Sequence, residues 1–458
     1  MRTTNILTSA RGTAAVLVIM AALATANDAR ANNRPATAEE IADLKAQIDT
    51  LRAEVQSLRA LVQRGTGMPA AVAPPAPAAQ AQTPPASLDP IVSMLQEQVA
   101  EQAQVKVESA SRLPVKLTGS IVANTFFNSG EANWLENPNV VTVPGPTTGS
   151  FSSTLRQSRI GLSADGPAIG NWRTSGQIAF DFLGGTSAFQ TGPTIGLPRL
   201  LYAFTRFETE RTAIEVGQDH AIVAPRDPTS IAAQAFPALY RSGNLYLRAP
   251  QVRLERRFGN GLDVRGGLVA PIAGDAAAEF VFSPPAGTGE RSRMPAFEGR
   301  LGFARGSADA RVLDLGISGH FGRQREPGDT RDSWAAVLDW NVQGGRLGAG
   351  GELFTGRHLA AFGGAAGQNV ESSGGFGEVR FTASSIVSFN AGVGLDRVPD
   401  DERSRTPIGE NRSAFGNVIV RITPEVSTSL EYRYLTTEPS RANERTNHHV
   451  DWALVYSF

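Results

Sequence analysis

The residues suited to acid–base or metal chemistry are few in this sequence, and their spacing does not fit such chemistry. None of the five histidines (His220, His320, His358, His448 and His449) stands in a motif such as G-x-S-x-G or H-E-x-x-H. His448 and His449 are adjacent, so in a strand they would point to opposite faces and could not chelate a metal together. With no cysteine, disulfides and thiolate metal sites are excluded. We therefore predict no metal, no cofactor and no enzymatic activity, with a hydrolase embedded in a membrane as the minor alternative.

A different kind of chemistry, electrostatic selection, is indicated by charged residues at every second position. Asp263 and Arg265, for example, alternate with Val264, and Leu268 continues the apolar set. In a strand, such a period of two places charges on one face and apolar groups on the other. The charged face then carries Arg159, Asp181, Arg253, Glu255, Asp263, Arg265, Glu298, Arg300, Glu378, Arg380, Glu431 and Arg433. Inside a closed barrel so many ionisable groups are more easily hydrated than packed, so we predict that they line an aqueous pore.

One long connection, residues 220–249, carries further charges. Its charged residues are Arg226, Asp227, Arg241 and Arg248, while Phe236, Tyr240 and Tyr246 could pack it against a wall. Three arginines against one aspartate make this connection locally positive, which in a narrow aqueous passage would favour small anions such as carboxylates, since low-dielectric walls focus the field of fixed charges. The alternative is that each arginine pairs with a nearby carboxylate on the wall.

The elements that would position these groups are alternating segments of roughly ten residues that recur from Pro114 to the last residue. They are 115–128, 151–164, 172–183, 198–207, 211–219, 250–258, 262–272, 295–304, 312–323, 332–342, 347–356, 374–383, 387–396, 412–421, 427–437 and 448–458. The pattern predicts an all-β transmembrane barrel of about 16 antiparallel strands, an even number that leaves both ends on one side.

The connections divide into two classes that alternate along the chain. Short ones fall at 165–171, 208–210, 259–261, 343–346 and 423–426, and long ones at 129–150, 220–249 and 273–293. Short periplasmic turns and long external loops are typical of an outer-membrane barrel. The final segment supports the same location, because Trp452, Leu454, Tyr456 and Phe458 form an apolar row that ends at the carboxyl terminus. This row resembles the signal read by the outer-membrane assembly machinery.

The N-terminal part predicts export and a periplasmic arm. Residues 1–26 have two arginines, an apolar run and an A-x-A site, which predicts a signal peptide; an uncleaved anchor helix is the alternative. Residues 27–64 carry an a/d heptad seam, residues 65–87 are a Pro/Ala-rich linker, and 88–110 form a short helix or connector before the barrel of 111–458. The seam is Ile41, Leu44, Ile48, Leu51, Val55, Leu58 and Val62.

This seam predicts a parallel homo-oligomer. Glu40 and Glu54 at g, with Lys45 and Arg59 at e, could pair between chains, although β-branched residues at a with leucine at d favour two strands. A helix packed on the barrel is the alternative.

Residues 155–165 (LRQSRIGLSAD), 176–182 (GQIAFDF) and 214–218 (IEVGQ) resemble the early strands of DcaP-like trimeric porins. The order of signal peptide, coiled coil, linker and barrel is also similar. The resemblance implies a homotrimeric diffusion channel for small, often negatively charged solutes such as dicarboxylates, and a third external loop that folds into the barrel. Asp219 and His220 stand where the family often has an aromatic residue after the Gly-Gln pair, which leaves the solute open.

The partners expected from the sequence are further copies of the chain in a trimer, outer-membrane lipid and lipopolysaccharide, and the outer-membrane assembly machinery. The arm either contacts peptidoglycan or only holds subunits in register. The formal net charge of −1 does not indicate a nucleic acid partner. A structural tether or adhesin that acts through the arm or the external loops is the second function to consider.

Overall fold

The computed structural model describes residues 115–142, 149–185, 196–275, 285–306, 311–364 and 369–458. The chain divides into two compact units, Met1–Leu88 and Asp89–Phe458, and all the described residues belong to the second. The predicted signal peptide, coiled coil, linker and connector helix lie outside the described residues. No helix of the described part is long and apolar enough to cross a membrane.

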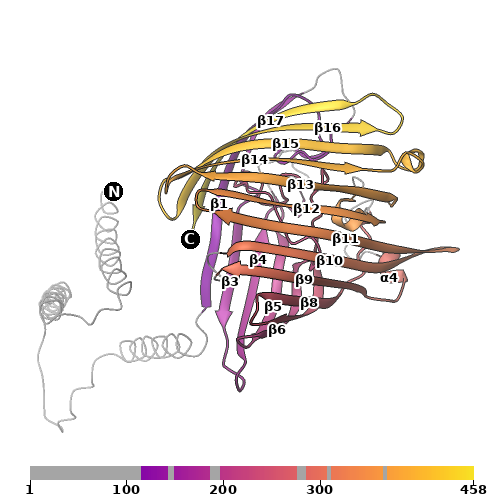
Figure 1. The fold of residues 1–458 in the computed structure, drawn as a ribbon. Coiled ribbons are helices and arrows are strands. Elements are labelled where there is room, and N and C mark those ends of the chain that lie inside the picture. The colour runs from indigo at the N-terminus through magenta and orange to yellow at the C-terminus, as the bar shows by residue number, and fades with distance from the viewer. Residues whose placement is uncertain (1–114, 143–148, 186–195, 276–284, 307–310, 365–368) are drawn as a thin grey trace, which may run out of the picture. The chain divides into compact units, whose positions relative to one another are not determined.

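Seventeen strands make up nearly all of the described structure, and they follow the alternating segments of the sequence (Figure 1). The first nine are β1 (Val115–Asn128), β2 (Ser150–Thr154), β3 (Arg159–Asp165), β4 (Arg173–Asp181), β5 (Arg199–Glu208), β6 (Thr212–His220), β7 (Arg248–Arg257), β8 (Leu262–Val269) and β9 (Ala296–Gly306). The others are β10 (Arg311–Glu326), β11 (Asp329–Gly344), β12 (Leu347–Arg357), β13 (Glu371–Thr382), β14 (Val387–Arg397), β15 (Ile408–Arg421), β16 (Val426–Pro439) and β17 (Arg445–Ser457). Short helical turns are α4 (Thr288–Arg291), η2 (Ala360–Phe362) and η4 (Arg403–Arg405).

The strands pair in chain order, all antiparallel, and the sheet closes on itself. The closing pair is β1 with β17, in register from Ser120 opposite Ser457 to Asn128 opposite His449. Strands β2 and β3 both pair with β1, at its two ends, so they form one interrupted span. Seventeen strands with two of them in one span make sixteen spans, which confirms the predicted barrel of about 16 strands. Closure leaves no free sheet edge among the seventeen described strands.

The interruption between β2 and β3 departs from the predicted single strand of 151–164. Residues 155–158 form a turn, in which the Ser158 N–H donates to the Leu155 carbonyl at 3.0 Å. The Ser158 hydroxyl replaces a ladder contact by accepting from the Val122 N–H at 3.0 Å. The turn also places Gln157 on the inner face, where its side chain is fully buried.

The two faces of the barrel differ in composition as the period of two requires. In β17 the outward residues are apolar and exposed, including Trp452 at 47% and Tyr456 at 47%, whereas Asp451 and Ala453 are buried on the inner face. The same outward row continues through the other strands, with Val393 at 63% as the most exposed example among the outward residues of β14. An apolar outer belt around a polar interior is the arrangement that suits a barrel surrounded by lipid.

One connection differs from the predicted alternation of short turns and long loops. β10 and β11 are joined by a hairpin of two residues, Pro327 and Gly328, although this connection is on the same end as the long loops. Gly328 has φ of 80°, a conformation that favours glycine. The predicted strands 312–323 and 332–342 were therefore too short, because charged residues near the hairpin obscured the continuing alternation.

We expect the inner face to be packed tightly enough for truncation to be costly. Leu435 lies on the inner face of β16 and is completely buried, so Leu435→Ala should lower the free energy of unfolding by about 2 to 5 kcal/mol. Leu430→Ala, at a position on the outer face of the same strand that is 53% exposed, should cost clearly less. Equilibrium unfolding in detergent micelles compares the two variants, and equal losses would contradict a packed interior at this level.

Candidate pore constriction

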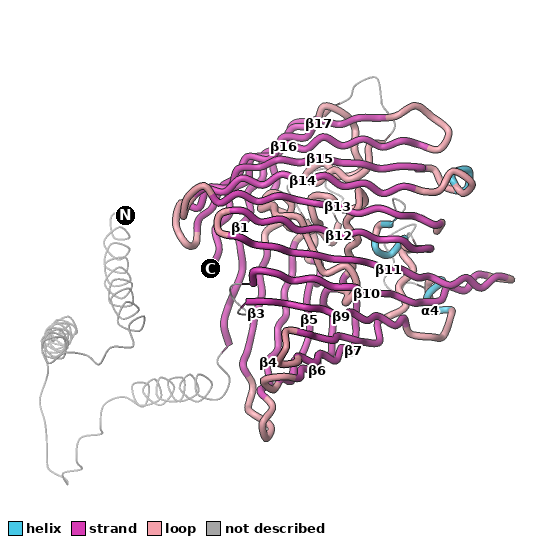
Figure 2. The backbone as a smooth tube through the Cα atoms, in the orientation of Figure 1, coloured by secondary structure: helices cyan, strands magenta, loops and turns pink. Residues whose placement is uncertain are grey.

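The connection between β6 and β7, residues 221–247 and here called L3, lies inside the barrel. Most of its apolar residues are buried, with Leu239 fully inaccessible and Leu245 at 2% exposed. Figure 2 shows loop segments of the chain inside the wall of strands. A buried loop must find partners for its backbone polar groups, because each unpaired group is costly away from water.

The first half of L3 finds these partners on four glutamates of the wall. They stand on different strands, and each accepts hydrogen bonds from L3. Glu298 of β9 accepts from the Ile222 and Val223 N–H groups at 2.7 and 3.2 Å. Glu352 of β12 accepts from the Arg226 N–H at 2.6 Å, and Glu378 of β13 accepts from the Thr229 N–H at 2.7 Å. Glu431 of β16 accepts from the Ser230 hydroxyl at 2.6 Å. L3 thus follows the wall strand by strand.

Amide side chains continue this support past the seam between β17 and β1. Asn124 of β1 and Gln157 both donate to the Ala232 carbonyl, at 3.0 and 2.7 Å. The Gln157 carbonyl oxygen accepts from the Gln234 and Ala235 N–H groups at 2.8 and 3.1 Å. The interruption between β2 and β3 therefore serves L3, since it presents the amide that holds three of its backbone groups.

The second half of L3 crosses to the opposite wall. Leu239 packs against Phe376 of β13 and Phe415 of β15. At Gly243, where φ is 101°, a Cβ atom would lie 2.0 Å from the carbonyl oxygen of Gly375, so only glycine allows this approach. L3 consequently lines most of the circumference and then crosses the interior, which narrows it.

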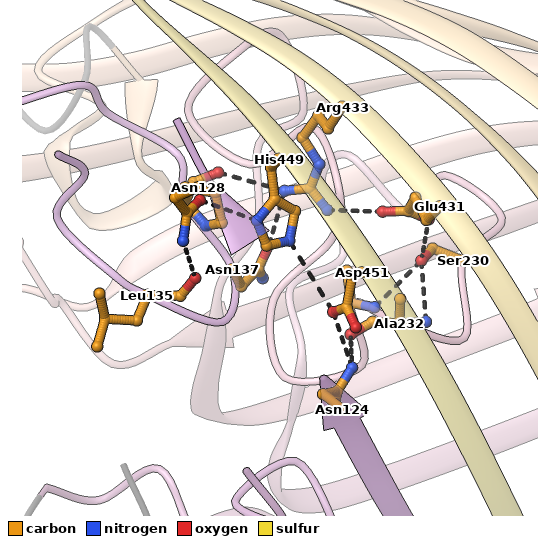
Figure 3. A network of polar contacts seen from close by, with 12 residues as sticks. Asn124, Asn128, Leu135, Asn137, Ser230, Ala232, Glu431, Arg433, His449 and Asp451 are labelled. Atoms are coloured by element: carbon orange, nitrogen blue, oxygen red, sulfur yellow. Dashed lines mark hydrogen bonds and ion pairs between the residues drawn. The ribbon is translucent and has the colours of Figure 1, made fainter. Parts of the chain in front are cut away.

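The first external loop also enters the interior, which the sequence did not indicate. Asn137 of this loop accepts a hydrogen bond from Arg433 at 2.8 Å and donates to the Phe236 carbonyl of L3 at 2.8 Å. Figure 3 shows this region, where Glu431, Arg433, His449 and Asp451 converge with Ser230 of L3. Asn and Ser residues in a long polar loop carry no periodicity, so a sequence pattern could not place them.

The four residues predicted for the constriction have different surroundings. Arg226 pairs with Asp314 and Asp339 at 2.9 and 2.8 Å, so the alternative of pairing with a wall carboxylate applies to it. Arg241 lies over the Tyr240 ring, 5.6 Å from its centroid. Arg248 is the first residue of β7 rather than a loop residue, and it stacks on Tyr202 and Tyr246 at 4.7 and 5.0 Å.

Asp227, the one acid of the predicted set, is held close to arginines. Burial raises the pKa of its carboxyl to about 6, although the positive charges of Arg248 and Arg159 oppose that rise. Arg159 donates to the Gln234 carbonyl of L3. Within the described residues neither Arg159 nor Arg248 has a carboxylate within ion-pair distance. These two guanidinium groups form a positive cluster beside L3.

The other residues predicted to line the pore lie on the inner face, most of them in ion pairs. Arg253 contacts Glu215, Asp219 and Glu255; Arg300 contacts Asp263, Asp314 and Asp339; Arg433 contacts Glu431; Arg380 contacts Glu378; and Asp181 contacts Arg199. Glu298 holds His320 at 3.1 Å, and Arg265 lies 3.7 Å from Asp263. Sequence reasoning missed Glu215, Asp314, Asp339 and Glu352, although the same period of two would have found them. No group of three or more metal-ligating side chains occurs among the described residues.

Comparison with known proteins identifies the fold. No family model and no curated protein matches the sequence. The structure is similar to the outer membrane channel DcaP of Acinetobacter baumannii, with a TM-score of 0.60 and 15% identity over 76% of this chain and 98% of that one. An anion-selective porin from Comamonas acidovorans has a TM-score of 0.53 and 10% identity over 76% and 100%, and Pseudomonas putida OprB has 0.52 and 10% over 78% and 97%. The resemblance to DcaP-like porins is thus confirmed at the level of the fold.

We expect the wall glutamates to keep L3 in place. The double substitution E298Q/E378Q replaces two charged acceptors by neutral ones, and each hydrogen bond to a charged group contributes about 1.5 to 3 kcal/mol. L3 should then open more often, so that trypsin cleavage after Arg241 in detergent becomes about tenfold faster or more. Glu371→Gln is the control, because Glu371 pairs with Arg357 outside L3. Equal cleavage rates in all three proteins would show that these glutamates do not hold the loop.

Proposed function

We propose that this chain is an outer-membrane porin that lets small hydrophilic solutes diffuse passively. The observation that supports this function best is a closed barrel, apolar outside and charged inside, whose interior is narrowed by L3 rather than filled by an apolar core. A charged interior retains water, and a loop held inside it sets the width of the passage.

The orientation follows from the two ends of the barrel. The end with the short turns and the C-terminus faces the periplasm, and the end with the longer loops faces outward. Residues 1–26 are removed as a signal peptide, and the arm of residues 27–110 extends into the periplasm. The barrels associate as a homotrimer, with the coiled coil holding the subunits together.

Solute preference follows from the charges that remain uncompensated. Arg226, Arg253 and Arg300 are each balanced by nearby carboxylates, so they contribute little net field. Arg159 and Arg248 lie beside L3 without an ion pair among the described residues. The acids that act on them there are the buried Asp227 and, for Arg159, Asp181, which is itself paired with Arg199. A low-dielectric wall concentrates their field along the passage, which favours anions, including carboxylates and dicarboxylates. One of the similar structures is an anion-selective porin, which supports the same preference.

This proposal predicts channels in a planar lipid bilayer that prefer anions under a salt gradient. R159Q/R248Q should keep the conductance, while the ratio of anion to cation permeability falls by about twofold or more. The control R346Q/R421Q also removes two positive charges, but from exposed positions at the short-turn end, and should change the ratio less. A bilayer without conductance would overturn the porin function, whereas a conducting channel that prefers cations would overturn only the anion preference.

The selectivity should also depend on pH through Asp227. Its carboxyl has a raised pKa of about 6, so it is mostly ionised at neutral pH and neutral in mild acid. Protonation removes the negative charge that opposes Arg159 and Arg248, so the anion preference should rise as the pH falls from about 7 to about 5. Asp227→Asn should show the higher preference at both pH values. Reversal potentials at the two pH values measure this, and a pH response that persists unchanged in Asp227→Asn would rule out Asp227 as its source.

A further inference from the structure

A cavity lies between the seventh and eighth external loops, residues 398–407 and 440–444, here called L7 and L8. Its volume is about 450 Å³, within the ~300 to 1,000 Å³ typical of small-molecule sites. It is lined by Ser404, Arg405, Thr406, Pro407, Pro439, Arg441, Ala442 and Arg445. Every charged residue of this lining is an arginine, and no carboxylate takes part.

The three arginines of this lining differ in their partners. Arg405 pairs with Glu402 at 3.2 Å. Arg441 donates to the Ser404 carbonyl at 3.3 Å, which leaves its charge unbalanced. Within the described part of the chain, neither Arg441 nor Arg445 forms an ion pair with a carboxylate. Two unpaired guanidinium groups at one cavity repel each other, and a bound anion would remove that repulsion.

In a neighbouring cavity the charges of the arginines are already compensated by carboxylates. It has a volume of about 380 Å³ and shares Arg405, but Asp332 is part of its lining. Its other arginines are already paired, Arg331 with Asp329 and Arg357 with Glu402. This second cavity therefore needs no ligand charge, unlike the L7–L8 cavity.

The position of the L7–L8 cavity narrows the class of ligand. On the outer face, Tyr434 of β16 stands opposite His448 of β17, and aromatic residues of this kind mark the boundary of the membrane. Arg445 is three residues further outward along β17, about 10 Å at the rise of a strand, and it shares the inner-face register of Asn447 and His449. The cavity therefore lies at the external mouth of the barrel, at the height of lipid headgroups, where it also faces solutes that approach the mouth.

We propose that the L7–L8 cavity binds a phosphate monoester carried on a sugar. Guanidinium groups bind phosphate oxygens in pairs of parallel hydrogen bonds, and the volume leaves room for the attached polar group. A phosphorylated glycolipid of the outer leaflet and a soluble sugar phosphate offer this same chemistry. The site goes beyond the proposed channel function, from which it takes only the external orientation of L7 and L8.

The test measures binding to the full-length protein in detergent. Purified lipid A is followed by native mass spectrometry, and glucose 6-phosphate, with glucose as the uncharged reference, by calorimetry. R441Q/R445Q should bind the recognised phosphate ester with an affinity that is lower by about tenfold or more, because two charged contacts are lost. R346Q/R421Q and R159Q/R248Q should bind as the unaltered protein does, which separates this cavity from a general charge effect and from the bore.

Binding of lipid A alone identifies the glycolipid as the source, and binding of glucose 6-phosphate identifies a soluble ester. The proposal is overturned if neither phosphate binds the unaltered protein better than glucose does, or if R441Q/R445Q binds as strongly as the unaltered protein. Arg441 is exposed and Arg445 is half-buried, and heat-modifiable gel mobility verifies that the variant is folded. Bilayer conductance of the same preparations tests the porin function separately, so failure of one proposal is distinguishable from failure of the other.

Discussion

The structure depends on one requirement, that a backbone segment buried inside the barrel must have its polar groups satisfied. L3 meets it through side chains of the wall rather than through secondary structure of its own. Glu298, Glu352 and Glu378 each accept from its backbone N–H groups, and Gln157 both donates to and accepts from it. The inward-facing residues of the strands therefore have two tasks: some hold L3, and others define the electrostatics of the space that L3 leaves.

Under the proposed function, these two tasks would allow a lumen with many charges to have a simple preference for anions. Most arginines of the inner face are compensated by carboxylates on the same strand or on strands nearby, as for Arg300 of β9 between Asp314 of β10 and Asp339 of β11. Such local pairs have short-range fields. The proposed anion preference then depends on the few groups left over, and the burial of Asp227, which raises the pKa of its carboxyl, reduces the negative charge that it sets against Arg159 and Arg248.

Much of the barrel could be predicted because alternation is a local property of the sequence. The predicted strands 115–128 and 347–356 differ little from β1 and β12, and Asp263 and Arg265 lie on the predicted face. What could not be predicted involves contacts between distant segments. The turn at residues 155–158 exists because Gln157 meets L3, and Asn137 enters the interior because Arg433 meets it there. The pairing of Arg226 also depends on where L3 settles, which no periodicity encodes.

The path of L3 relative to the closing pair β1 and β17 has a consequence for the order of folding. Ser230 is held by Glu431 of β16, and Ala232, two residues later, is held by Asn124 of β1. L3 is therefore attached on both sides of the junction where β1 pairs with β17. Before that line is joined, one set of attachments is missing, and the loop cannot reach its final place. L3 would thus dock late in folding, and this segment from the middle of the chain then stabilises the junction of the first and last strands.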